Sequence, residues 1–144
     1  MDDITPLTLK IEALARKAGE AILEIYRHPN TLTIQSKADS TPVTDADLAA
    51  HRLIQQGLQQ LTPDIPILSE ESPETEIQQR HQWQRYWLVD PLDGTKEFIK
   101  RNGEFTVNIA LIEGHDSVLG VVHVPTTATS YLGNREQGAG KMED

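Results

Sequence analysis

Acidic residues gather at three places in the sequence where a predicted helix or strand begins or ends. If the folded chain brings them together, two carboxylates about 4 Å apart repel by roughly 4 kcal/mol at an effective dielectric constant near 20. Four or five such carboxylates together would need cations or protons to offset their charge. Oxygen ligands favour a hard cation, Mg²⁺ first, with Mn²⁺ or Ca²⁺ as alternatives. In chain order these residues are Asp47, Glu70, Glu71, Asp90 and Asp93.

The segment Asp90–Thr95 is the most informative of the three places. Pro91 fixes its own φ angle and predicts a turn directly after a buried strand. That turn lets the two aspartates point to one side. Gly94 lets the backbone approach a ligand closely, and Thr95 begins a predicted helix whose N–H groups suit a phosphate. Carboxylates shared between two metal ions beside such a helix describe a two-metal phosphatase site.

Each acidic element also has a structural interpretation when it is taken alone. Asp47 suits a helix cap, the Glu70–Glu71 pair suits a solvated surface, and Asp90–Gly94 suits an ordinary turn. The histidines show no spacing of three or four that would indicate a ligand pair. We therefore predict that they are surface or satisfied core residues. They are His28, His51, His81, His115 and His123.

The elements that position these acids are predicted from hydrophobic spacing. Apolar residues three and four positions apart indicate amphipathic helices over 4–27 and 45–61. Two helices followed mainly by strands indicate an α+β fold with the helices packed on an antiparallel sheet. Strands are expected over 31–35, 65–68, 85–89, 105–112, 118–124 and 128–132, with polar loops at 36–42 and 73–82, a short helical segment at 96–100, a hairpin connection at 113–116 and a glycine-rich turn at 133–140.

Composition excludes several classes of protein. Thirteen Lys and Arg against 22 Asp and Glu give a net charge of −9, which argues against a nucleic-acid binder. The absence of cysteine excludes disulfides and thiolate zinc sites. The longest apolar run, Ile109–Ile112, is too short for a transmembrane helix. With an acidic start, this favours a cytoplasmic protein, and peripheral association with the inner face of the membrane stays an open alternative.

The combined pattern resembles the inositol monophosphatase superfamily of Mg²⁺-dependent, lithium-sensitive phosphatases. The matching segments are Lys37–Asp39, Pro42–Asp47, Leu68–Glu71 and Trp87–Leu111. The stretch Asp93–Phe98 resembles the bacterial 3'(2'),5'-bisphosphate nucleotidase branch, because it has Glu97 where inositol phosphatases usually have Asn. The resemblance extends over essentially all 144 residues. It implies the N-terminal part of a layered αβαβα fold.

The resemblance implies metal-binding roles for five residues. Glu70 and Asp90 would hold a first ion, helped by the carbonyl of Leu92. Asp90 would bridge to a second ion that Asp93 also holds. Glu71 would act in the outer shell or on a looser third ion. The implied cofactor is Mg²⁺.

The resemblance also implies roles in the reaction. Asp47 and Thr95 would orient and deprotonate the attacking water, and the N–H groups of Gly94 and Thr95 would receive the phosphate. The implied reaction converts 3'-phosphoadenosine 5'-phosphate to AMP in sulfur assimilation, with 3'-phosphoadenylyl sulfate as a related substrate. The substrate would contact Glu70, Leu92, Asp93, Gly94 and Thr95.

One departure from the family leaves alternatives open. The family's Trp-Asp motif is absent, because Trp83 and Trp87 are followed by Gln84 and Leu88. We therefore expect residues 1–144 to be a single N-terminal domain that is incomplete at its C-terminus and that self-associates. The alternatives are an inactive metal-binding module of the same family, an inositol monophosphatase, and a small acidic interaction protein.

Overall fold

The computed structural model describes residues 4–27, 34–36, 42–69, 83–94, 104–136 and 138–143. Its helices are α1 (Ile4–Arg27) and α2 (Asp45–Leu61), with a short 3₁₀ helix, η3 (Pro125–Thr127). Both long helices have the bounds that hydrophobic spacing predicts. No described helix is long and apolar enough to cross a membrane. The strands are β1 (Ile34–Ser36), β2 (Pro42–Thr44), β3 (Ile67–Ser69), β4 (Arg85–Asp93), β5 (Thr106–Glu113), β6 (Asp116–Val124), β7 (Thr129–Asn134) and β8 (Gly138–Glu143).

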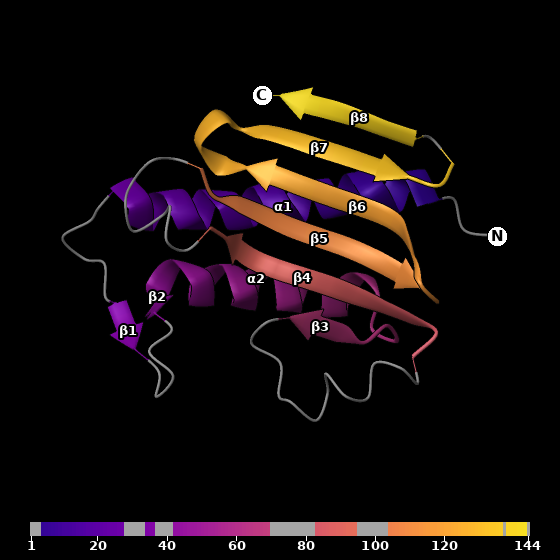
Figure 1. Cartoon of the computed structure of the whole chain (residues 1–144), viewed down its shortest axis with the longest axis horizontal. Coiled ribbons are helices and arrows are strands. Elements are labelled where there is room, and N and C mark those ends of the chain that lie inside the picture. The colour runs from indigo at the N-terminus through magenta and orange to yellow at the C-terminus, as the bar shows by residue number, and fades with distance from the viewer. Residues whose placement is uncertain are drawn as a thin grey trace.

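Strands β3 to β8 form one sheet in chain order, and β1 pairs with β2 separately (Figure 1). The pairs from β4 to β8 are antiparallel, while β3 runs parallel to β4. The predicted α+β class is confirmed, but the sheet is mixed rather than wholly antiparallel. A parallel neighbour requires a long crossover, and the distance in sequence from Ser69 at the end of β3 to Arg85 at the start of β4 is long enough for one.

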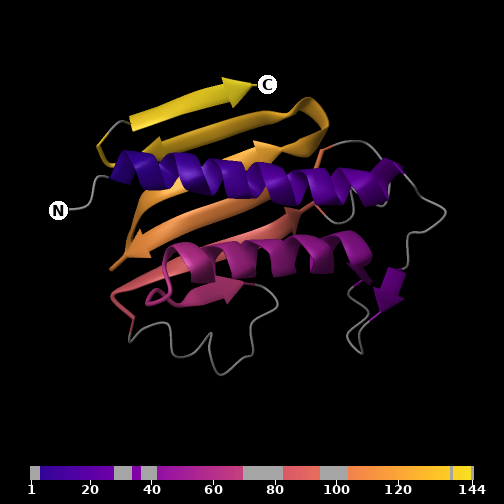
Figure 2. The same ribbon diagram turned by 180° about the vertical axis from the view of Figure 1, so that it is seen from behind.

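Both helices cover the same face of the sheet (Figure 2). They lie behind the strands in Figure 1 and in front of them in Figure 2. The buried stripes of α1 and α2 repeat at the helical spacing and meet alternate side chains of β4, β5 and β6. These residues form one core, whose fully buried large side chains include Ile11, Ile22, Ile54, Leu58, Trp87, Phe105, Val107, Ile109, Leu111, Leu119 and Val121.

The opposite face of the sheet carries exposed apolar side chains. Leu88 is 43% exposed, Val122 39% and Tyr131 50%. Because side chains alternate along a strand, these residues point away from the helices. They line a shallow hollow of about 830 Å³ whose edge includes Asp90 and Asn108. This face, which we call the open face, is therefore mainly apolar with polar groups at its margin.

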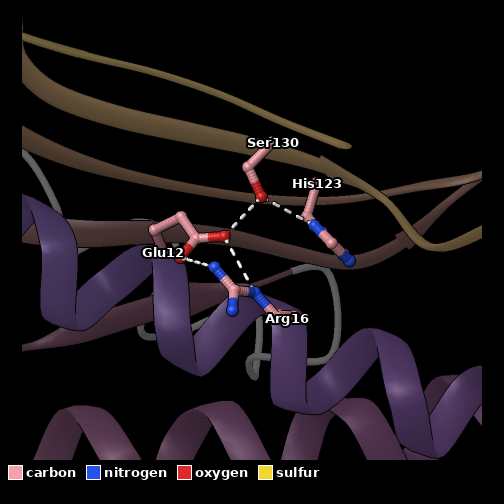
Figure 3. Close-up of polar contacts among 4 residues, drawn as sticks. All are labelled: Glu12, Arg16, His123 and Ser130. Carbon is pink, nitrogen blue, oxygen red and sulfur yellow. Dashed lines mark hydrogen bonds and ion pairs between the residues drawn. The ribbon is translucent and has the colours of Figure 1, made fainter. Parts of the chain in front are cut away.

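A buried polar network fastens α1 to the sheet (Figure 3). Glu12 on α1 is 2% exposed and accepts a 2.7 Å hydrogen bond from the Ser130 hydroxyl on β7. The same hydroxyl lies 2.7 Å from Nδ1 of His123 on β6. Since Ser130 gives its single proton to Glu12, the proton of this second bond is assigned to Nδ1. Arg16 pairs with Glu12 at 2.6 Å from the following turn of α1.

Two predictions of secondary structure near the C-terminus are wrong. Residues 133–140 are not a single turn, because Gly133 and Asn134 end β7 and Gly138 begins β8. Ala128 is not in a strand. It has φ 52° and caps η3 through a bond from its N–H to the Pro125 carbonyl.

The other predicted strands are confirmed with shifted ends. The strand predicted at 65–68 is 67–69, and that at 85–89 continues to Asp93. The hairpin between β5 and β6 is confirmed, with Gly114 at φ 62° in its turn. The polar loop predicted at 36–42 is shorter than predicted, because Ser36 ends β1 and Pro42 begins β2, and these two residues pair. The loop at 73–82 and the helical segment at 96–100 lie outside the described residues.

Candidate active site

A β-bulge places Asp90 and Asp93 on one face of the sheet. Residues three apart in a regular strand point to opposite faces, because the side-chain period is two. Here Asp90 pairs with Asn108 and Asp93 with Thr106, so β4 uses one more residue than β5 over this stretch. The extra residue brings both carboxylates to the open face. The sequence predicts this shared direction, but it comes from a bulge within the strand and not from a turn after it.

Pro91 fits this interpretation of the backbone. Proline cannot donate to a sheet ladder and is found at bulges or edges, and β4 is an inner strand. At a bulge the ladder does not require a hydrogen bond from every residue, so the missing N–H of Pro91 is tolerated there. Pro91 and Leu92 are buried, and the Leu92 side chain packs in the core at 3% exposure. Two buried residues thus anchor the segment between the two aspartates.

Asp93 is held by a chain of side-chain hydrogen bonds from β5. Thr106 Oγ1 donates to Asn108 Oδ1 at 3.0 Å, and Asn108 Nδ2 donates to Asp93 Oδ2 at 3.1 Å. The Asp93 side chain is exposed. Neither Thr106 nor Asn108 is singled out by the sequence analysis. Their signal is a polar residue at alternate positions of a strand whose other face is apolar.

Gly94 has φ 93°, a region that only glycine enters without strain. It directly follows Asp93 and is half-buried. This supports a glycine requirement at the position where the sequence predicts a close backbone approach. Thr95, the next predicted site residue, lies outside the described residues.

Asp47 is the third residue of α2 and is 9% exposed. One helical turn later, Nδ1 of His51 lies 3.4 Å from the hydroxyl of Ser69, the last residue of β3. Ser69 is paired with Val89, the residue before Asp90. The second turn of α2 is thus linked to the last residue of β3, whose strand partner Val89 directly precedes Asp90.

The described chain contains part of the predicted acidic group. It contains Asp47, Asp90, Leu92, Asp93 and Gly94, whereas Glu70, Glu71 and Thr95 fall outside the described residues. Within the described ranges, no three His, Asp or Glu side chains are close enough to hold a metal ion.

The described histidines agree with the prediction for that residue type. His51 and His123 make hydrogen bonds inside the fold, and His115 is exposed in the turn between β5 and β6. His28 and His81 lie outside the described residues.

The donor atoms present suit a hard divalent cation. Asp90 and Asp93 contribute carboxylates on one face, and Asp93 has one oxygen fixed by Asn108. Oxygen donors of this kind select Mg²⁺, Ca²⁺ or Mn²⁺ over softer metals. Two carboxylates fall short of the six or more ligands of such an ion, so water, substrate or further residues would complete its coordination.

Comparison with known proteins shows which family the sequence is similar to. Residues 3–143 match the model of the inositol monophosphatase family. The chain is 60% identical over 118 residues to the 3'(2'),5'-bisphosphate nucleotidase CysQ of Escherichia coli O6:H1, a match that covers 82% of the chain and 48% of that protein.

Solved structures agree in fold. The crystal structure of CysQ from Bacteroides thetaiotaomicron, 43% identical, superposes with a TM-score of 0.79 over 96% of this chain and 49% of its own. An IMPase/NADP phosphatase crystallised with NADP and Ca²⁺ has a TM-score of 0.85 over 98% of this chain and 52% of its own, at 20% identity.

The chain spans about half the length of the relatives that it matches. Whether the protein that contains this chain shares the activity of these relatives is therefore proposed below. The family match itself covers nearly every residue, in agreement with the motifs and with the fold. This chain belongs to the inositol monophosphatase family.

Proposed function

We propose that the protein containing this chain is a Mg²⁺-dependent 3'(2'),5'-bisphosphate nucleotidase. The main structural support is the bulge, which sets Asp90 and Asp93 on one face of the sheet, where Asn108 donates a hydrogen bond to Asp93. The 60% identity to a CysQ nucleotidase supports the substrate class. In this proposal Glu70, Asp90, the Leu92 carbonyl and Asp93 hold metal ions, and Glu71 acts in the outer shell.

The proposed reaction is hydrolysis of the 3'-phosphate of 3'-phosphoadenosine 5'-phosphate. The oxygen of water bonds to phosphorus, the bond from phosphorus to the 3' oxygen breaks, and that oxygen takes a proton from solvent water to give AMP and inorganic phosphate. Asp47 and Thr95 together orient and deprotonate the attacking water, and the Asp47 carboxylate is the group that holds its proton. The N–H groups of Gly94 and Thr95 bind the phosphate. Bound divalent cations supply charge stabilisation to such a phosphoryl transfer and make water more acidic.

The left-handed conformation of Gly94 supports the phosphate-binding part of this proposal. A residue without Cβ lets successive backbone N–H groups turn toward an anion. The following residue, Thr95, would begin the helical segment predicted at 96–100. Its N-terminal N–H groups would then point toward the same phosphate.

The proposed cellular role is in sulfur assimilation, in the cytoplasm, with inhibition by lithium as the family resemblance implies. An inositol monophosphatase is the main competing function. The nucleotidase is favoured because the CysQ relatives are far more similar in sequence than the IMPase/NADP phosphatase, whose 20% identity supports the fold alone. The segment Lys96–Arg101, which follows Gly94 and Thr95 in the sequence, also resembles the nucleotidase branch and carries Lys96, Lys100 and Arg101.

The deciding experiment uses the protein that contains this chain. It compares kcat/KM for 3'-phosphoadenosine 5'-phosphate and for inositol 1-phosphate, with millimolar Mg²⁺ and with a chelator. We expect a clear preference for the nucleotide and no turnover with the chelator. Equal values, or a preference for inositol 1-phosphate, would assign the chain to the inositol phosphatases. Absence of phosphate release from either substrate would favour the inactive metal-binding module.

A further inference from the structure

We propose that Asn108 is a positioning residue for Asp93 and that Thr106 fixes the orientation of Asn108. The inference rests on the proposed function only in assigning a divalent cation to Asp93. Thr106, Asn108 and Asp93 form a row on the open face. Hydrogen bonds of 3.0 Å, from Thr106 to Asn108, and 3.1 Å, from Asn108 to Asp93, join them.

The direction of the chain follows from the chemistry of its groups. An ionised carboxylate only accepts hydrogen bonds, so the atom of Asn108 that faces Asp93 is the amide nitrogen, Nδ2. The amide oxygen then faces Thr106, whose hydroxyl supplies the donor. A flipped amide would set its oxygen against the carboxylate and lose the bond to Asp93. The acceptor-only carboxylate therefore selects the amide orientation, and the Thr106 hydroxyl holds the amide in it by donating to Oδ1.

The bulge explains why Asp93 needs such a partner. It shifts the register so that Asp93 pairs with Thr106, and it leaves an exposed side chain at the end of β4. An exposed carboxylate samples several rotamers, and binding a metal ion would have to order it. Asn108 holds Oδ2. Within the described residues, the hydrogen bond to Asp93 is made to Oδ2, so we assign Oδ1 as the oxygen that binds the ion.

The register also explains why this position holds an amide. Asn108 is directly opposite Asp90 across the sheet while its side chain reaches Asp93. Directly opposed residues have Cβ atoms about 4.5–5.5 Å apart. A third carboxylate here would repel both aspartates, and an apolar side chain would donate nothing. An amide is neutral, donates to Asp93 and accepts from Thr106.

Substitution of Thr106 separates this role from packing. Thr106→Val keeps the shape and removes the hydroxyl, whereas Thr106→Ser keeps the hydroxyl and removes the methyl group. The probe is Mn²⁺, whose free concentration is followed by electron paramagnetic resonance. Groups that orient a metal ligand typically change metal affinity 10–100-fold. We expect Thr106→Val and Asn108→Leu to weaken Mn²⁺ binding by about 10-fold or more, and Thr106→Ser to bind nearly as wild type does.

Matched controls carry the same chemical changes elsewhere in the sheet. Thr129→Val removes a hydroxyl that donates to the Thr127 carbonyl, and Asn134→Leu removes an amide that donates to Thr8. Both belong to β7, away from Asp93. We expect neither control to change the Mn²⁺ dissociation constant. Circular dichroism verifies that each variant is folded.

Several results would overturn the assignment: Thr106→Ser as weak as Thr106→Val, Asn108→Leu binding like wild type, or a wild-type chain that binds no Mn²⁺ at millimolar concentration. The expected pattern of affinities, together with no hydrolysis of 3'-phosphoadenosine 5'-phosphate by the protein that contains this chain, would keep the assignment and overturn the nucleotidase proposal. The two failures are therefore distinguishable.

Discussion

Ser130 donates a 2.7 Å hydrogen bond to Glu12, although 118 positions separate the two residues in the chain. Both side chains are nearly inaccessible, at 1% and 2% exposure. The bond joins the first helix to β7 across the sheet interface (Figure 3). A buried carboxylate requires partners, and here it has a hydroxyl from the sheet and a guanidinium from its own helix.

Glu12→Ala should therefore lower the free energy of unfolding by about 3 kcal/mol, since it leaves the buried Ser130 hydroxyl, which itself accepts from His123, without its own acceptor in the interface. Arg16 is 30% exposed, so water compensates for part of its lost ion pair. Urea unfolding measures the change. Glu20→Ala, an exposed change on the same helix, is the control and should stay within about 0.5 kcal/mol of wild type. A loss no larger than the control's would contradict a stabilising role.

The two helical glycines should respond in opposite ways to alanine. A Cβ at Gly19 would lie 2.7 Å from Cδ2 of His123, whose ring Ser130 holds. A Cβ at Gly57 would lie 2.5 Å from Cδ1 of Leu14, the far end of a flexible, partly buried side chain. Alanine favours a helix over glycine by up to about 1 kcal/mol. We expect Gly19→Ala to destabilise by about 1–3 kcal/mol and Gly57→Ala to be neutral or stabilising.

Thermal unfolding of both variants tests this contrast. Because the intrinsic helix preference is the same at both positions, the difference between them reports the surroundings alone. A Gly19→Ala variant as stable as Gly57→Ala would show that the His123 ring moves freely.

Local sequence patterns were sufficient to predict the helices and the class of fold. The 3.6-residue period gave both helices their bounds, and the motifs indicated the family. The period also placed Asp47 in the first turn of α2. These features depend on residues near one another in the chain, so they can be recognised without tertiary contacts.

Non-local pairing explains what the sequence left unpredicted. The bulge at Asp90 and Asp93 is defined by partners on β5, and the Asn108 bond to Asp93 follows from that register. Strand β8 contains Gly138 and Gly140, which have low strand propensity; only pairing with β7 identifies it as a strand. The bond between Glu12 and Ser130 joins two distant segments and leaves no local signal.

The open face should make this chain self-associate when it is expressed alone. Contiguous exposed apolar surface of this kind marks an interaction site or an association hazard. We expect sedimentation velocity to show oligomers that grow with concentration. Leu88→Gln and Val122→Thr should reduce them, because both side chains point from the open face. Leu61→Gln, at the end of α2, is the control with similar exposure, 37%. A monomer at every concentration would contradict the prediction.

Mg²⁺ should stabilise the folded chain weakly through the two aspartates of β4. A ligand at ten times its dissociation constant adds about 1.4 kcal/mol, which for a chain of this size raises the melting temperature by about 3–6 °C. A chelator should reverse the shift, and Asp90→Asn or Asp93→Asn should abolish it. Asp116→Asn, an exposed aspartate at the start of β6, should retain it. An equal shift in Asp90→Asn would place the ion elsewhere.

Asp47 gives the sharpest test of the proposed chemistry. If it accepts the proton of the attacking water, Asp47→Asn in the active protein should lower kcat by about 10²–10⁴-fold, the usual contribution of a general base. Metal affinity should change little, because Asp47 is not a proposed ligand, and Thr95→Ala should behave in the same way. A helix-capping role makes a different prediction: a loss of about 1 kcal/mol in stability with unchanged turnover per folded molecule. Asp64→Asn, in the turn that follows α2, is the control for a carboxylate change away from the site. Measuring turnover, Mn²⁺ affinity and unfolding on the same variant separates the two roles, and unchanged kcat with lowered stability would remove Asp47 from the mechanism.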